Sequence, residues 1–138
     1  MADLSQRYYS PRQILVAAFL GSPLAGGYLA SRNYSVFGTS SKATVTWVVS
    51  ILLFIGLLAL GYVLPKELNH LNPVIIALVA VGYQLHANLA FAPEIARLQS
   101  EGWVAHSWWR VVGLSLAIVT AAMALIFCVL LMLNVHAA

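Results

Sequence analysis

Charged residues are scarce in this sequence. Only 8% of its 138 residues are Asp, Glu, Lys or Arg, while 62% are hydrophobic, and an ordinary soluble domain carries about 25% charged residues. A surface that faces water cannot be built from so few charges. The formal net charge of +3 is also too small and too scattered for a nucleic-acid interface, which needs a basic stripe. These scarcities exclude a soluble domain and argue against a nucleic-acid partner.

Cysteine is nearly absent. The single Cys128 lies inside an apolar run, so neither an intrachain disulfide nor a cysteine metal cluster can form. His70, His106 and His136 have no second ligand at metal-binding spacing on the same segment, and a zinc site needs three or four converging ligands. We therefore expect no metal and no other cofactor.

Acidic residues are missing from the apolar runs. Asp3, Glu67, Glu94 and Glu101 all lie outside them, whereas proton-coupled transporters usually keep a carboxylate or another proton-relaying group at membrane depth. Only His86 could take that role. The serines have no partnering base and no phosphate-binding loop occurs, so the sequence does not predict an enzyme.

Four apolar segments dominate what is present. Residues 43–64, 73–92 and 111–135 are long enough to cross a hydrocarbon core of about 30 Å as helices, and residues 14–30 are barely so. No internal repeat or linker divides them. The sequence therefore predicts an all-α integral membrane protein, with residues 1–138 forming one domain in contact with the lipid bilayer.

The first segment has two interpretations, because glycines and the pair Ser22-Pro23 interrupt it. A helix of about 17 residues can span if the bilayer thins locally. Alternatively, the chain turns back at Gly21-Ser22-Pro23 as a re-entrant hairpin, whose broken backbone persists only when protein covers it or it lines a wet cavity. A chain this small offers little cover, so a hairpin would imply an oligomer. We expect a spanning helix and keep the hairpin as the alternative.

Basic residues predict the orientation, because they gather on the cytoplasmic side. Loops 31–42 and 93–110 hold two bases each and residues 65–72 hold one, which places both loops in the cytoplasm and residues 65–72 outside. A spanning first segment leaves four bases inside against three outside, and a hairpin gives six against one. The charge rule thus favours the hairpin. The four bases are Arg32, Lys42, Arg97 and Arg110; the hairpin adds Arg7 and Arg12, and Lys66 stays outside.

The stretch between segments three and four has the features of a membrane interface. Residues 93–101 predict a short amphipathic helix lying on the membrane surface, with charged residues on one face and apolar residues on the other. Aromatic residues that suit a headgroup belt follow it. The charged face is Glu94, Arg97 and Glu101, the apolar face is Ile95 and Leu98, Gly102 ends the helix, and the interfacial anchors are Trp103, Trp108, Trp109 and Arg110.

Small residues recur at four-residue spacing, which lets membrane helices approach closely. Such rows predict tight packing within the chain or between copies of it. The rows are Ala17-Gly21-Ala25, Ser22-Gly26-Ala30 and Gly113-Ala117-Ala121.

Two sets of polar residues are candidates for binding or transport. Ser22 and Pro23 would begin a half-helix whose positive end points into the membrane and favours anions. Gln84, His86 and Asn88 lie in segment three, where polar groups are costly unless paired or hydrated. The ordinary interpretation of His86 is an interfacial or internally hydrogen-bonded side chain.

Two strings resemble those of a family of small uncharacterised bacterial integral membrane proteins. They are Phe-Leu-Gly-Ser-Pro-Leu-Ala-Gly-Gly-Tyr-Leu-Ala-Ser-Arg-Asn-Tyr at 19–34 and Ser-Trp-Trp-Arg-Val-Val-Gly at 107–113. The resemblance implies a bacterial cytoplasmic membrane and no known activity. The size and first segment are also similar to double-barrelled fluoride channels, but their membrane-embedded Asn and Phe-rich polar break are absent. Small multidrug exporters share the four-segment plan, but their first-helix Glu is missing.

These observations together predict a small helix bundle without enzymatic activity, acting as a structural or accessory component of the bacterial inner membrane. We expect self-association through the small-residue rows and a membrane protein as a further partner. The alternative is a homo-oligomeric channel or transporter for a small ion or solute.

Overall fold

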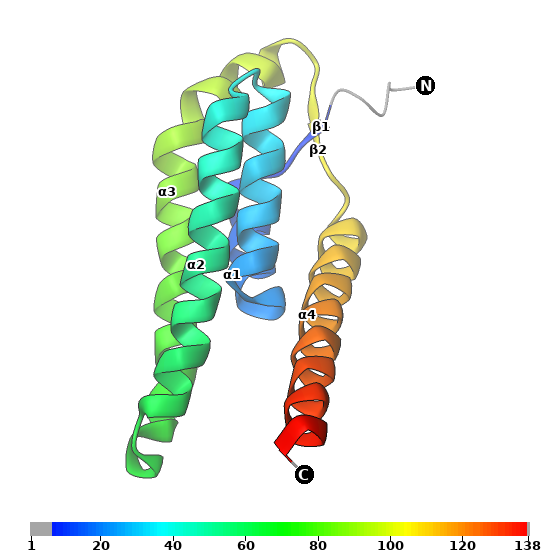
Figure 1. Ribbon diagram of the computed structural model, residues 1–138. Coiled ribbons are helices and arrows are strands. Elements are labelled where there is room, and N and C mark those ends of the chain that lie inside the picture. The colour runs from blue at the N-terminus through cyan, green and yellow to red at the C-terminus, as the bar shows by residue number, and fades with distance from the viewer. Residues whose placement is uncertain (1–6, 138) are drawn as a thin grey trace.

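The computed structural model describes residues 7–137, without the side chains of Asn69 and 134–137. The chain is 87% helical, and Figure 1 shows long helices running roughly parallel or antiparallel. The elements in order are β1 (Arg7–Tyr8), α1 (Pro11–Val36), α2 (Ser40–Val63), the 3-10 helix η1 (Lys66–Leu71), α3 (Asn72–Ser100), β2 (Val104–Ala105) and α4 (Trp108–Ala137).

Four helices, α1 to α4, are long and apolar enough to cross a membrane. The predicted segments 43–64, 73–92 and 111–135 coincide with α2, the greater part of α3, and α4. The prediction of an all-helical chain built from four apolar helices is therefore confirmed, and it indicates a multi-pass membrane protein.

The first of these helices is not one straight rod. Ser22 has φ 72° and ψ 173° within α1, and the chain reverses there, so that one half descends and the other climbs back beside it (Figure 1). The Asn33 side chain consequently reaches the backbone of Tyr9, at 2.8 Å from its N–H and 2.7 Å from its carbonyl oxygen. In an unbroken helix these two residues would lie about 36 Å apart. The chain therefore reverses at Ser22, as the hairpin alternative expects, and the expected single continuous helix is not observed.

The α1 hairpin forms the centre of the bundle. Helices α2, α3 and α4 all pack on it, and 56% of its apolar stretch is buried, against 17% in α3, 11% in α2 and 0% in α4. Figure 1 shows α4 on one side of α1, with α2 and α3 on the other. Cover for the broken backbone thus comes from the same chain, which corrects the expectation that a hairpin would require an oligomer.

Local sequence explains where the hairpin begins. The Ser10 hydroxyl accepts from the N–H of Gln13 at 3.3 Å, and the Gln13 side chain accepts from the N–H of Ser10 at 3.0 Å. This reciprocal pair is a capping box, and Pro11 occupies the first helical position, where no N–H is needed. Serine before proline thus marks the start of the helix, three residues before the apolar run 14–30.

The predicted surface helix at 93–101 is not a separate element. Residues 93–100 continue α3, with Pro93 inside the helix, and the last turns of α3 lean toward β1 and β2 in Figure 1. Its two faces are as expected: Arg97 pairs with Glu94 and, at 3.9 Å, with Glu101, while the apolar face is buried. Gly102, with φ 87°, follows the helix end as predicted. The buried residues of that face are Ile95 and Leu98.

The connections place the two ends of the bundle. β1 pairs with β2 in parallel, with Arg7 opposite Val104, so the start of α1 lies beside the start of α4. The turn between α1 and α2 is at this same end, which we call the basic end, and η1 is at the opposite end (Figure 1).

Candidate functional site

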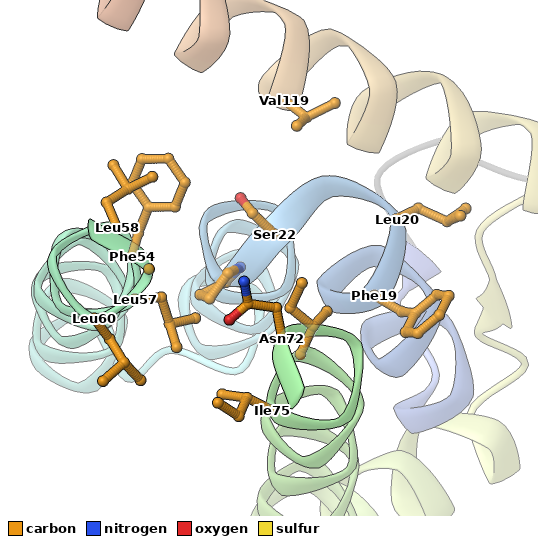
Figure 2. A pocket seen from close by; sticks show the side chains of 13 residues that line it. Phe19, Leu20, Ser22, Phe54, Leu57, Leu58, Leu60, Asn72, Ile75 and Val119 are labelled. Atoms are coloured by element: carbon orange, nitrogen blue, oxygen red, sulfur yellow. The ribbon is translucent and has the colours of Figure 1, made fainter. Parts of the chain in front are cut away.

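The tip of the hairpin holds the predicted half-helix start. Ser22 and Pro23 line a cavity of about 340 Å³ with residues from α2, α3 and α4. Figure 2 shows the Ser22 hydroxyl directed into the space between Phe54 of α2 and Val119 of α4. Its oxygen is buried and has no hydrogen-bond partner among the described residues. The surroundings are otherwise mostly leucine, isoleucine and phenylalanine side chains, and Asn72 of α3 is the second polar side chain of the lining.

The glycines of α1 each contact a different neighbour. A Cβ at Gly21 would lie 2.7 Å from the Ser115 carbonyl oxygen of α4, and one at Gly27 would lie 1.9 Å from the Ser50 hydroxyl of α2. Within the hairpin, a Cβ at Gly26 would lie 2.6 Å from that of Ala18. Close packing through the first-segment glycines is therefore seen on three sides, as membrane helices use small residues. The remaining small residues of both rows in α1 that are buried are Ala17, Ala25 and Ala30.

The third small-residue row lies elsewhere. Gly113, Ala117 and Ala121 are exposed on α4, and a Cβ at Gly113 would meet no atom within 4 Å. The buried face of α4 at this level is instead formed by Val111 and Ser115. Packing of this row inside the chain is thus not observed: Gly113 and Ala117 lie on the outward side of α4, and Ala121 borders a cavity between α4 and α2.

The polar residues of segment three point in different directions. Nε2 of His86 lies 3.1 Å from the Tyr34 hydroxyl of α1, so the internally hydrogen-bonded interpretation of His86 agrees with the geometry. Asn88 is exposed and Gln84 is half-buried. Tyr34 is about 18 Å along the helix from Ser22, so the structure does not bring the two predicted candidate sets together.

Apart from Ser22, the polar side chains between the helices at Ser50, Tyr83 and Ser115 form hydrogen bonds to nearby residues. The Tyr83 hydroxyl donates to Ser50 at 2.6 Å, and Ser50 donates to the Thr46 carbonyl at 2.7 Å. Ser115 donates to the Val111 carbonyl at 2.7 Å. Since an unpaired buried polar group is costly, these bonds serve the packing of the helices and leave little free polarity at membrane depth.

A second, polar cavity lies at the basic end. Its volume is about 120 Å³, and four segments distant in sequence build it: β1, the end of the α1 hairpin, the loop after β2, and the first turn of α4. We call it the arginine pocket, and its lining residues are Arg7, Tyr9, Arg32, Asn33, Val36, His106 and Arg110.

Buried amides hold the arginine pocket together. Asn33, with 0% of its surface exposed, fixes Tyr9 through the two bonds given above. The buried Gln13 donates from Nε2 to the His106 carbonyl at 2.6 Å, and the His106 N–H donates to the Tyr8 carbonyl at 2.9 Å. The rings of Tyr9 and His106 stack with centroids 4.3 Å apart. The chain segments that form the pocket are therefore hydrogen-bonded to one another.

The electrostatics of this pocket are strongly positive. Burial and the nearby guanidinium groups of Arg110, Arg7 and Arg32 lower the pKa of His106 to about 4, because each disfavours a further positive charge. Nδ1 of His106 and Nε of Arg7 are buried without a hydrogen-bond partner among the described residues. The site can accept an anion at neutral pH without gaining a proton.

The predicted interfacial anchors occupy distinct positions. Trp108 and Trp109 are 49% and 86% exposed, as expected of side chains in a headgroup belt. Trp103 is half-buried and packs against the core. Arg110, expected to extend to headgroups, lines the arginine pocket instead.

Sequence reasoning missed most of the arginine pocket. The sequence places three of its residues outside the apolar segments, namely Arg7, Arg32 and His106. It marks Asn33 only as part of the string at 19–34. The available signal was Gln13, a polar residue at the start of an apolar helix. A single spanning segment gives this side chain no partner. In the hairpin, the chain returns to the basic end, where Gln13 donates to the His106 carbonyl.

Comparison with known proteins adds no relationship: no family model, no curated protein and no solved structure matches this chain.

Proposed function

We propose that this chain is a multi-pass protein of the bacterial cytoplasmic membrane, with three spanning helices around a re-entrant hairpin, acting as a non-enzymatic structural or accessory component. The observation that carries the proposal is the position of α4. This helix packs chiefly on α1, and 0% of its apolar stretch is buried. A long helix with so much free apolar surface is suited to lipid and to other membrane helices.

The hairpin gives the proposed topology its orientation. The first half of α1 has about 11 residues and reaches about 16 Å, half of a core of about 30 Å, so Ser22 would sit near the bilayer centre. The amino terminus and loops 31–42 and 93–110 then share one side with six bases, leaving Lys66 on the other. The positive-inside rule makes the basic end cytoplasmic.

The exposed row Gly113-Ala117-Ala121 supports self-association. Its residues are exposed on α4, and open space at Gly113 lets another helix approach closely. A second copy, or a helix of another membrane protein, would cover this row.

Cross-linking in native membranes tests this role. The wild-type chain should give a dimer, and G113I or A117I should reduce it by about tenfold. M123F is the matched control, since Met123 is exposed on α4 and lies about 120° around the helix from Ala117. A wild-type chain that stays monomeric and co-purifies with no other membrane protein would refute the accessory role.

A homo-oligomeric channel or transporter is the second candidate, favoured by the Ser22 hydroxyl at the head of the tip cavity. The N–H groups of the half-helix after Pro23 point toward this region and would attract an anion. Liposomes containing the protein should then pass a halide or another small ion faster than empty vesicles, and S22A should change the rate. A flux equal to that of empty vesicles, for halides and for protons, removes this candidate.

A further inference from the structure

We propose that the arginine pocket is a binding site for a tetrahedral oxyanion of the phosphate class, held by the guanidinium groups of Arg7, Arg32 and Arg110. The proposal does not depend on the accessory role of the protein. It goes beyond that role because it assigns a ligand to a specific cavity.

The positive charge of the arginine pocket is the first reason to expect an anion there. The pocket places three guanidinium groups around about 120 Å³, and no carboxylate occurs among the described residues that line it. Among residues 7–137, ion pairs form only around Arg97, with Glu94 and Glu101. Burial and, after it, the guanidinium groups of Arg110, Arg7 and Arg32 lower the pKa of His106. Positive charge concentrated in this way is costly unless an anion balances it.

Buried N–H groups without a hydrogen-bond partner are the second reason. Arg7 Nε is buried and has no partner in the described part of the chain, although a guanidinium N–H is always a donor. His106 Nδ1 is also buried without a partner there, and it donates in the tautomer that carries the proton on Nδ1. Asn33, the buried amide of the lining, hydrogen-bonds to Tyr9 and to neither of these two nitrogens. Several N–H donors converging on one small space match the oxygens of a phosphate, which arginine binds in bidentate fashion.

The third reason is that hydrogen bonds hold the pocket in a fixed shape. The bonds from Gln13 to the His106 carbonyl and from Asn33 to Tyr9 fix the pocket walls. The β1–β2 pairing fixes Arg7 opposite Val104. A pre-organised site loses less entropy on binding, so the arginines need not be gathered by the ligand.

The phosphate could belong to a lipid headgroup or to a soluble anion. Exposed Trp108 and Trp109 lie beside Arg110 at the start of α4, which suits a headgroup, while the openness of Arg32 and Arg110 to solvent suits a soluble anion. Both sources offer the same oxyanion chemistry, and the experiment separates them.

Binding is measured on the full chain in neutral detergent by isothermal titration with inorganic phosphate and, separately, by native mass spectrometry after exposure to phosphatidylglycerol or phosphatidylcholine. The variants are R32Q, R110Q and the triple R7Q/R32Q/R110Q. R12Q is the matched control, because Arg12 is an exposed base of the same end outside the pocket. Each pocket substitution should weaken binding by about tenfold, and R12Q should leave it unchanged.

The outcomes are distinct. Titratable inorganic phosphate that is lost in the triple variant identifies a soluble anion. Retention of phosphatidylglycerol by the wild type, but not by the triple variant, without a phosphate signal identifies a headgroup. The D3N variant is measured in parallel so that the chain's own Asp3 carboxylate cannot compete. If neither ligand binds to wild type or D3N, or if R12Q weakens binding as much as R32Q, the proposal is overturned.

Discussion

Asn33 joins the two ends of the α1 hairpin: its amide nitrogen donates to the Tyr9 carbonyl at 2.7 Å, and its amide oxygen accepts from the Tyr9 N–H at 2.8 Å, across 24 residues of sequence. This pair of bonds satisfies the backbone N–H and carbonyl of Tyr9, which lies between β1 and α1. It also places Arg32 beside the amino-terminal segment, so the same contact closes the hairpin and builds the arginine pocket.

Replacing Asn33 with alanine should therefore destabilise the protein. N33A leaves the N–H and carbonyl of the buried Tyr9 without partners, which predicts a loss of about 2–4 kcal/mol in the free energy of unfolding. Equilibrium unfolding in detergent measures this. N88A removes an exposed amide of α3 and should change stability little; equal losses in the two variants would contradict the role given to Asn33.

Gly27 should tolerate no side chain. The Cβ of G27A would fall 1.9 Å from the Ser50 hydroxyl and 2.2 Å from its Cβ, so α1 and α2 must move apart. Overpacking of this kind costs about 1–3 kcal/mol. At Gly56 of α2 nothing lies within 4 Å of an added Cβ, so G56A should be neutral or stabilising in the same thermal-unfolding assay. The prediction fails if G27A is as stable as G56A.

Ser22 adopts a backbone conformation that glycine prefers. At φ 72° and ψ 173°, a side chain costs about 1–3 kcal/mol, while glycine adds entropy to the unfolded chain. S22G should gain about 1 kcal/mol in net stability, and S22V should lose stability. S41G, in the first turn of α2, should lose about 0.5 kcal/mol. A loss in S22G as large as in S41G would show that the turn is not strained at Ser22.

His106 makes stability depend on pH. Its folded pKa of about 4 lies below the ordinary 6.5, so between these values the unfolded chain holds more protons. Stability therefore rises with pH in this window: the contribution is present above pH 6.5 and is lost progressively toward pH 4. H106Q should remove this part of the slope, measured by thermal unfolding across that range.

H70Q is the control for that experiment, because His70 is exposed at the opposite end of the bundle. Its slope should match the wild type. A wild-type slope unaltered by H106Q would contradict the positive environment assigned to the arginine pocket.

Sequence patterns predicted the helices well because span length and apolar composition depend on local residues. Segments two to four and the helix end at Gly102 follow from neighbours within a few positions. The hairpin was harder, since glycine and proline are tolerated both in spanning helices and at a reversal. The distribution of basic residues favours the hairpin. The small size of the chain argues against it, because little protein is expected to cover the broken backbone.

The expectation of little cover was wrong because it depended on tertiary packing. Gly21, Gly26 and Gly27 let three neighbours approach the hairpin closely, which spacing alone could not assign to particular partners. The arginine pocket was missed for a related reason: Arg7, Arg32 and Arg110 meet only after the reversal at Ser22. Residues far apart in sequence cannot be grouped while the direction of one helix is undecided.

The side of the membrane on which the amino terminus lies tests the hairpin most directly. Single cysteines at Asp3, Ser41 and Glu67, in a C128A background, are labelled with a membrane-impermeant maleimide in right-side-out and inverted vesicles. A re-entrant α1 predicts that D3C and S41C react from the cytoplasmic side and E67C from the other. Reaction of D3C together with E67C, opposite to S41C, would mean that α1 crosses the membrane and would contradict the hairpin.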